Sequence, residues 1–280
     1  VKAVIDLASE QTGLDIPALC FEENDKLNIT EYTQICMLAV EAAIYQAIID
    51  KGITPDVTAG LSLGEYGALI ASGAMTMADA FTVVRKRGIY MQEAVPTGGA
   101  MTAVLGLDPQ VIEDICKKTA DETNSVVSVA NYNCPGQIVI TGEKAAVDAA
   151  AAACSEAGAK RCVPLKVSGP FHSAMLKGAG EKLADALESV EIHDIKVPYI
   201  TNVTADYVKS PADVKDYLTQ QVSSSVRWQQ TIERLIADGA DEFVEIGPGR
   251  SLSGFMRKIN RDVKVVNIDK LEDFEKYVNR

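Results

Sequence analysis

The chain has 280 residues, of which 47% are hydrophobic, 24% charged and 6% aromatic. This composition excludes a disordered, fibrous or disulfide-dense protein, and the length accommodates one large or two modest domains at roughly 150 residues each. The 27 Lys and Arg residues against 39 Asp and Glu residues give a formal net charge of −12, so we expect neither nucleic acid nor an anionic membrane as a partner.

The first elements in chain order predict a helix, a strand, a sharp turn and two further helices. After Thr30, apolar residues recur at three- and four-residue steps over 32–49, which is the spacing of an amphipathic helix. A short β-prone segment over 56–60 is followed by helical spacing over 65–71. A further helix over 77–92 ends before a proline and two glycines. This alternation indicates an α/β domain.

The order of predicted strands and helices changes after Gly99. The segments follow the order β-α-β-β-α-β, with extended stretches and helices over 100–105, 109–119, 125–130, 137–141, 144–157 and 161–167. This order matches a ferredoxin-like insert of about 70 residues. We therefore expect a small subdomain over 98–167.

Strands and helices alternate again after the insert. The predicted segments are a helix over 174–188, a strand over 197–202, a helix over 226–238, a strand over 242–245, a helix over 252–260 and a strand over 263–268. Such alternation is typical of a mostly parallel sheet covered on both faces. The fold class is therefore α/β, and residues 1–97 and 168–280 form the predicted large subdomain.

The cysteine spacing and the hydropathy pattern bear on location. The six cysteines show no C-x-x-C pair and no metal-ligand spacing, so we expect free thiols in a reducing compartment and no metal site. No run of about 18 apolar residues occurs, and the first residues lack the basic start and apolar middle of a signal peptide. These observations favour a cytoplasmic protein.

A G-x-S-x-G pentapeptide, Gly60-Leu61-Ser62-Leu63-Gly64, lies between the predicted strand and the predicted helix. In this context the two glycines permit a sharp turn that projects Ser62 as a nucleophile. The N–H of Leu63, at the helix N-terminus, would stabilise the oxyanion that forms when Ser62 attacks. The alternative is a glycine-flanked turn serine without chemistry.

A serine hydroxyl needs a base, and the chain has only two histidines. His172 follows a predicted strand and precedes a helix, whose N-terminus would disfavour the imidazolium and keep the ring a neutral base. The alternative for His172 is a capping or turn histidine. His193 lies in a charged linker and is interpreted as solvated. No carboxylate can be assigned to orient the ring, and a backbone carbonyl could serve instead.

Arg87 differs from its neighbours Arg85 and Lys86, which we interpret as a solvated helix face. It precedes Gly88 in a segment where an arginine can point inward and hold a substrate carboxylate through two hydrogen bonds. The alternative is that Arg87 belongs to the same solvated face.

Five motifs, in this order along essentially the whole chain, together resemble the malonyl-CoA:acyl carrier protein transacylases of the acyltransferase family. They are Ala59-Gly60-Leu61-Ser62-Leu63-Gly64-Glu65-Tyr66, Arg87-Gly88 with Met91-Gln92-Glu93-Ala94, Asn133-Cys134-Pro135-Gly136-Gln137, Gly169-Pro170-Phe171-His172-Ser173 and Val244-Glu245-Ile246-Gly247-Pro248-Gly249. The resemblance implies an α/β-hydrolase-like large subdomain with a ferredoxin-like small subdomain.

The resemblance also implies a role for individual residues. Ser62 would be the acylated nucleophile and His172 the base, oriented by the main-chain carbonyl of Gln221. Arg87 would hold the free malonyl carboxylate, and the N–H of Leu63 would be one oxyanion donor. Further residues that would line the substrate site are Asn133, Asn202 and Phe171, the last being similar to malonyl-selective members.

The sequence departs from the family pattern in two places. Leu61 stands where many members have His, which we expect to be harmless. The family's Gly-Gln-Gly-x-Gln loop, source of the second oxyanion donor, is absent, so either the sequence is incomplete or that donor comes from elsewhere. Loss of one such donor costs about 10²–10³ in rate, or roughly 3–4 kcal/mol.

The resemblance implies malonyl-CoA and acyl carrier protein as partners, in fatty-acid or polyketide synthesis. Coenzyme A enters as the thioester substrate, and we expect no cofactor and a monomer. Two alternatives stay open: a serine thioester hydrolase on the same scaffold, and a carrier-binding protein without catalytic activity.

Overall fold

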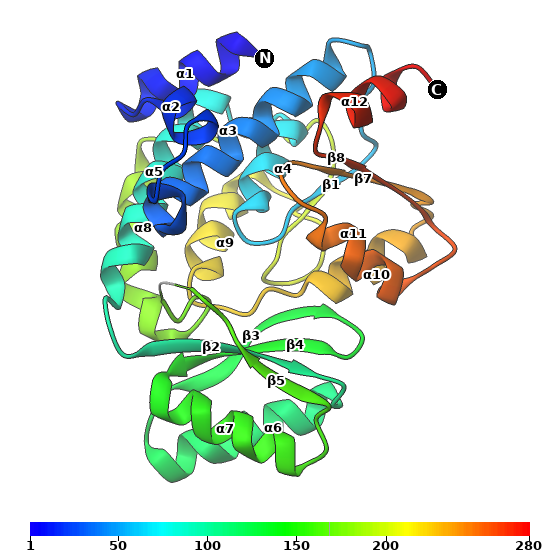
Figure 1. The fold of residues 1–280 in the computed structure, drawn as a ribbon. Coiled ribbons are helices and arrows are strands. Elements are labelled where there is room, and N and C mark those ends of the chain that lie inside the picture. Colours follow the sequence, from blue (N-terminus) through cyan, green and yellow to red (C-terminus); the bar gives the residue numbers. More distant parts are fainter. Residues whose placement is uncertain (168) are drawn as a thin grey trace.

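The computed structural model describes residues 1–167 and 169–280. A large body carries both termini, and a sheet with two helices forms a separate unit beside it (Figure 1). Ser168, where the predicted second segment of the large subdomain begins, lies outside the described residues. The subdomain boundaries stay a prediction.

The smaller unit has the predicted β-α-β-β-α-β order. Its elements are β2 (Gly99–Leu105), α6 (Pro109–Thr123), β3 (Val127–Cys134), β4 (Gln137–Glu143), α7 (Lys144–Glu156) and β5 (Arg161–Pro164). The strands pair in the order β3-β4-β2-β5, and every pair is antiparallel. This arrangement confirms the ferredoxin-like subdomain.

The two faces of this sheet have different neighbours. Helices α6 and α7 cover one face, with Val104, Ile112 and Ile140 in the shared core. The other face presents Met101 and its apolar neighbours, against which Phe171 packs. The sheet therefore contacts the chain segment that carries His172.

The large subdomain contains two parallel strand pairs. β1 (Thr58–Ala59) pairs with β6 (Tyr199–Ile200), and β7 (Glu242–Ile246) pairs with β8 (Lys264–Ile268). The parallel pairing agrees with the prediction, but β1 and β6 are shorter than expected. β1 ends because the chain turns sharply at Gly60, and β6 ends opposite the last residue of β1. Beyond β6, the N–H of Thr201 bonds to the carbonyl of Asp206 and that of Asn202 to the Glu65 side chain.

Helices surround these strands. They are α1 (Lys2–Thr12), α2 (Ile16–Phe21), α3 (Thr30–Ile49), α4 (Gly64–Ser72), α5 (Met77–Ala94), α8 (Lys177–Glu188), α9 (Val214–Gln221), α10 (Trp228–Ala237), α11 (Ser251–Ile259) and α12 (Leu271–Val278), with short 3₁₀ turns η1 (Lys26–Asn28), η2 (Ala174–Leu176) and η3 (Pro211–Asp213). Helices α1, α2, α9 and α12 are absent from the elements that the sequence predicts. The last three have only six to eight residues, too few for a clear helical period.

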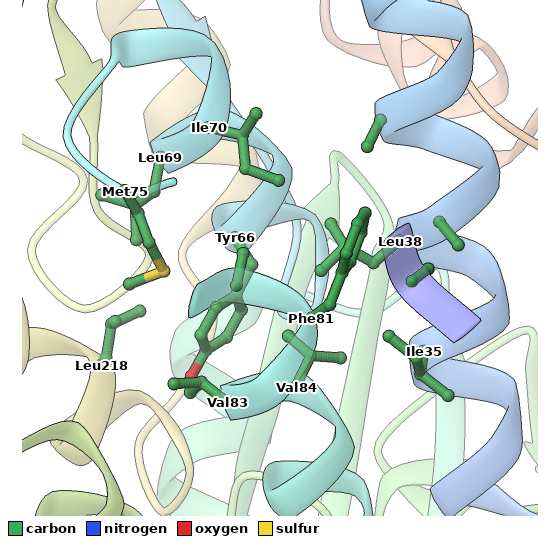
Figure 2. Packing of buried hydrophobic residues seen from close by; sticks show 14 of the residues in the cluster. Ile35, Leu38, Tyr66, Leu69, Ile70, Met75, Phe81, Val83, Val84 and Leu218 are labelled. Atoms are coloured by element: carbon green, nitrogen blue, oxygen red, sulfur yellow. The ribbon is translucent and has the colours of Figure 1, made fainter. Parts of the chain in front are cut away.

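The core of the large subdomain lies around α3 and α5, which pack side by side. Ile35 and Leu38 of α3 face Phe81 and Val84 of α5 (Figure 2). By length and composition α3 is the one helix among the described residues that could cross a membrane, and 44% of that stretch is buried within the protein. Its residues Ile35, Leu38 and Ala39 are fully buried in this core.

Candidate active site

Ser62 lies in the turn between β1 and α4. Its φ is +53°, a left-handed conformation that costs a non-glycine residue about 1–3 kcal/mol and is characteristic of a nucleophile on a strand-to-helix turn. A Cβ at Gly60 would lie 1.9 Å from the carbonyl oxygen of Gly64, so only glycine fits there. A Cβ at Gly64 would meet nothing within 4 Å, so the expectation that both glycines avoid a clash is correct for Gly60 alone.

Two buried amide side chains hold this turn. Oδ1 of Asn202 accepts the Ser62 N–H at 2.5 Å, and Nδ2 of Asn202 donates to the carbonyl of Gly60 at 2.6 Å. Nε2 of Gln221 donates to the carbonyl of Ser62 at 2.9 Å. These bonds stabilise the strained backbone. Asn202 thus braces the turn with both of its side-chain polar atoms, and its expected place in the lining of the substrate site stays a prediction.

The structure brings His172 to Ser62 across 110 residues of sequence. Oγ of Ser62 lies 2.8 Å from Nε2 of His172, and Nδ1 of His172 lies 2.8 Å from the main-chain oxygen of Gln221. Because a carbonyl oxygen only accepts, Nδ1 carries the proton and Nε2 is left to accept from the Ser62 hydroxyl. His172 therefore has the tautomer that a general base requires, and a backbone carbonyl orients it.

The imidazole of His172 is buried and stays neutral. Burial lowers its pKa to about 4, the charge of Arg87 contributes to the lowering, and hydrogen bonds to the backbone of Gln221 and Ser224 oppose the shift. The predicted neutral base agrees with this direction. The cause is different, because the segment that follows is the three-residue η2, and burial and Arg87 take the place of a helix N-terminus.

Arg87 points inward and is 1% exposed. Its Nη2 donates to Oγ of Ser62 at 3.1 Å and to Oε1 of Gln221 at 3.0 Å, and its Nη1 donates to Oε1 of Gln34 at 2.6 Å. Its Nε is buried without a hydrogen-bond partner, and among the described residues no carboxylate lies within ion-pair distance of it. Such a buried cation favours an anionic group of a substrate as its counter-charge.

The main-chain N–H of Leu63 is placed to bind an oxyanion. The first backbone bonds at the start of α4 run from Gly64 to Leu61 and from Glu65 to Ser62. The Leu63 N–H, next to the nucleophile, meets no acceptor within the described part of the chain. This free donor at a helix N-terminus agrees with the predicted oxyanion contact.

The remaining predicted site residues are Phe171 and Asn133. Phe171 precedes His172 and packs against the cores of both subdomains, so it lies where they meet. Asn133 is buried in β3, and no hydrogen bond of residues 1–167 and 169–280 joins it to Ser62 or His172. Its contact with a substrate stays a prediction.

Sequence reasoning missed Gln34, Glu65 and Tyr66. Gln34 accepts from Arg87, the Tyr66 ring lies 5.7 Å from the Arg87 guanidinium, and Glu65 accepts two hydrogen bonds from site residues. A signal was present, since Gln34 is a polar residue on an apolar helix and Glu65 is a charged residue in the first turn of another.

The electrostatic arrangement of the site suits acyl transfer. A serine, a neutral imidazole and a backbone N–H converge on one point, with a buried cation 3.1 Å from the nucleophilic oxygen. Among the described residues no group of three or more His, Cys, Asp or Glu side chains could hold a metal ion. That no cofactor takes part remains an expectation.

Comparisons with known proteins agree with this geometry. The acyl transferase domain model matches residues 4–268. The malonyl CoA-acyl carrier protein transacylase of Bacillus subtilis is 45% identical over 276 residues, which are 98% of this chain and 87% of the relative. The enzyme of that name from Staphylococcus aureus is 42% identical over 272 residues, covering 96% of this chain and 87% of the relative.

Solved structures show the same likeness. The crystal structure of MCAT from Streptococcus pneumoniae has a TM-score of 0.95 and 45% identity, covering 99% of this chain and 90% of that one. An acyl carrier protein S-malonyltransferase from Vibrio cholerae has a TM-score of 0.95 and 38% identity, over 99% and 90% of the two chains. The chain belongs to the family of malonyl CoA-acyl carrier protein transacylases, which carry the acyl transferase domain.

Proposed function

We propose that this chain transfers a malonyl group from coenzyme A to the phosphopantetheine thiol of acyl carrier protein through an ester of Ser62. The observation that carries the proposal is the buried Arg87 guanidinium, which lies 3.1 Å from the Ser62 oxygen and forms no ion pair among the described residues, although the charge of Glu65 acts on it at longer range. A malonyl thioester brings a free carboxylate to that cation when its carbonyl carbon reaches Ser62.

In the first half-reaction, Nε2 of His172 removes the hydroxyl proton while Oγ of Ser62 attacks the thioester carbonyl. The oxyanion forms beside the Leu63 N–H, and the Gln221 carbonyl stabilises the imidazolium through Nδ1. The intermediate collapses to the serine ester, and coenzyme A leaves as its thiol with the proton from His172.

The second half-reaction runs the same steps in reverse order. His172 removes the proton of the carrier thiol, whose sulfur attacks the malonyl ester, and Ser62 recovers its proton. Among the similar structures is a type II PKS acyl-carrier protein in complex with its malonyl-transacylase, at 38% identity and a TM-score of 0.95. It supports a carrier protein as acceptor and leaves the choice between fatty-acid and polyketide synthesis open. We also propose a monomer in the cytoplasm.

Carrier docking requires local positive charge, because this chain is itself acidic at −12. The exposed candidates are Lys117, Lys118, Lys160, Arg161, Lys166 and Lys177. Reversing two or three of these charges should raise the KM for the carrier and leave the KM for malonyl-CoA unchanged. Unchanged carrier kinetics would mean that these residues only solubilise the surface.

Intact-mass analysis after mixing with malonyl-CoA tests the nucleophile. The wild-type chain should gain one malonyl group and Ser62→Ala should gain none, and an adduct on the Ser62→Ala protein contradicts the assignment. Rapid release of free malonate without carrier would indicate a hydrolase. Carrier binding without acylation would indicate a protein that binds but does not catalyse.

A further inference from the structure

We propose that Glu65 is a positioning residue for acyl transfer, whose buried carboxylate holds the two residues that orient His172 and brace the Ser62 turn. The proposal rests on the function proposed above and adds to it a residue that touches neither the substrate nor the reacting atoms.

Glu65 is the second residue of α4 and is 0% exposed. Its Oε2 accepts a hydrogen bond from Nε2 of Gln221 at 2.7 Å and another from the main-chain N–H of Asn202 at 3.1 Å. The donors lie 156 and 137 residues away in sequence. One carboxylate oxygen therefore joins three distant segments of the large subdomain directly behind the nucleophile.

Gln221 transmits the position of Glu65 to the reacting groups. Its main-chain oxygen accepts from Nδ1 of His172, its Nε2 donates to the Ser62 carbonyl, and its Oε1 accepts from Arg87. Because all three contacts belong to one residue, a shift of Gln221 moves the base, the nucleophile and the cation together. Glu65 is one of the groups that hold the Gln221 side chain, and its bond at 2.7 Å is the shortest of those that this side chain makes.

Asn202 is the second residue through which Glu65 acts on the Ser62 turn. Glu65 holds its main chain, and its side chain binds both the N–H of Ser62 and the carbonyl of Gly60. The left-handed backbone of Ser62 persists only because such contacts hold it. Removal of the Glu65 acceptor therefore frees both the turn and the base to relax.

A buried carboxylate is energetically costly at a position that packing alone would fill with an apolar residue. Burial raises the pKa of Glu65, and the hydrogen bonds from Asn202 and Gln221 and the charge of Arg87 oppose that rise. The geometry explains why a carboxylate stands there nonetheless, because an apolar side chain offers no acceptor to these two donors.

The chain offers a matched control in Glu41. This residue of α3 is half-buried, and its carboxylate lies beside Gly67 of the same helix α4 and beside Gly247. Within the described part of the chain it has no hydrogen bond to Ser62, His172 or Gln221. Glu41→Gln thus makes the same chemical change near α4 without touching the network.

The experiment measures the rate constant of Ser62 acylation by malonyl-CoA in single turnovers, read by intact mass. Glu65→Met should lower it by about 10² with the KM for malonyl-CoA changed by less than about threefold, because displacement of catalytic groups lowers the chemical step rather than binding. Glu65→Gln keeps an oxygen acceptor and should lose less than about tenfold. Glu41→Gln should stay within about twofold.

Three results would overturn the proposal. They are a wild-type acylation rate in folded Glu65→Met, a loss expressed in KM alone, and an equal loss in the Met and Gln variants. If Glu65→Met does not fold, Gln221→Met serves instead, because it keeps the main-chain carbonyl and removes the amide that Glu65 holds. A folded Gln221→Met protein with the wild-type rate would equally refute the role of Glu65.

A second readout separates this proposal from the proposed function. Labelling of Ser62 by phenylmethylsulfonyl fluoride reports on serine activation without any malonyl group. If the wild-type chain is labelled but takes no malonyl, the proposed function fails, and the Glu65 variants should still be labelled more slowly than wild type and Glu41→Gln. Equal labelling of all variants would refute the positioning role alone.

Discussion

Nη2 of Arg87 lies 3.1 Å from Oγ of Ser62, which places a buried cation against the nucleophile itself. The same cation disfavours the imidazolium of His172, whose pKa burial has already lowered. Arg87 therefore acts on the serine and on the base, and the proposed substrate carboxylate would be a further partner.

The pH below which the acylation rate falls should lie well under the ordinary pKa of a histidine. The base must be neutral, and burial lowers the pKa of His172 from 6.5 to about 4, so the rate constant should be level from pH 8 to about pH 5 and fall below that. Arg87→Gln should raise the pH at which the rate falls, because the cation no longer opposes protonation of His172. A wild-type rate that falls between about pH 6 and 7 would contradict the buried, neutral imidazole.

Arg87→Met should change which acyl group is accepted. A charge-assisted, bidentate bond between guanidinium and carboxylate is lost, so acylation by malonyl-CoA should fall by about 10²–10³, with a much smaller effect on acetyl-CoA. Initial acylation rates with both thioesters provide the ratio. Equal losses for the two substrates would mean that Arg87 serves Ser62 and does not bind the carboxylate.

The two glycines of the pentapeptide should respond differently to alanine. Gly60→Ala places a methyl group 1.9 Å from a backbone oxygen, so the turn must rearrange and the free energy of unfolding should fall by about 3 kcal/mol or more. Gly64→Ala meets open space at the start of a helix and should change stability by less than about 1 kcal/mol. Urea unfolding of both variants checks this, and equal stabilities would contradict the close approach of Gly60 to Gly64.

Glu41→Gln should stabilise the protein increasingly as the pH rises. Burial raises the pKa of Glu41 from 4.5 to about 8 in the folded state, so the unfolded chain ionises first and stability is lost between these pH values. A glutamine has no such proton, and its advantage in unfolding free energy should grow by about 3–4 kcal/mol from about pH 4.5 to pH 8. An advantage that does not change with pH would show that Glu41 ionises freely.

Local patterns along the chain were sufficient to predict much of this protein. The strand-turn-helix around Ser62 and the order of the ferredoxin-like subdomain both follow from short-range periodicity and glycine placement. With only two histidines available, the choice of His172 as the partner of Ser62 followed from the residue count and the position of a loop. These features depend on residues near one another in sequence.

Contacts between distant segments could be decided only by the tertiary structure. Glu65 and Gln34 stand out in the sequence only as polar residues on apolar helices, and their roles arise from hydrogen bonds to residues that lie far away in the chain. The neutral state of His172 likewise depends on how deeply the fold buries it and on where Arg87 points. Burial and the orientation of polar groups are properties of the packed molecule, and a pattern of residue types along the chain does not specify them.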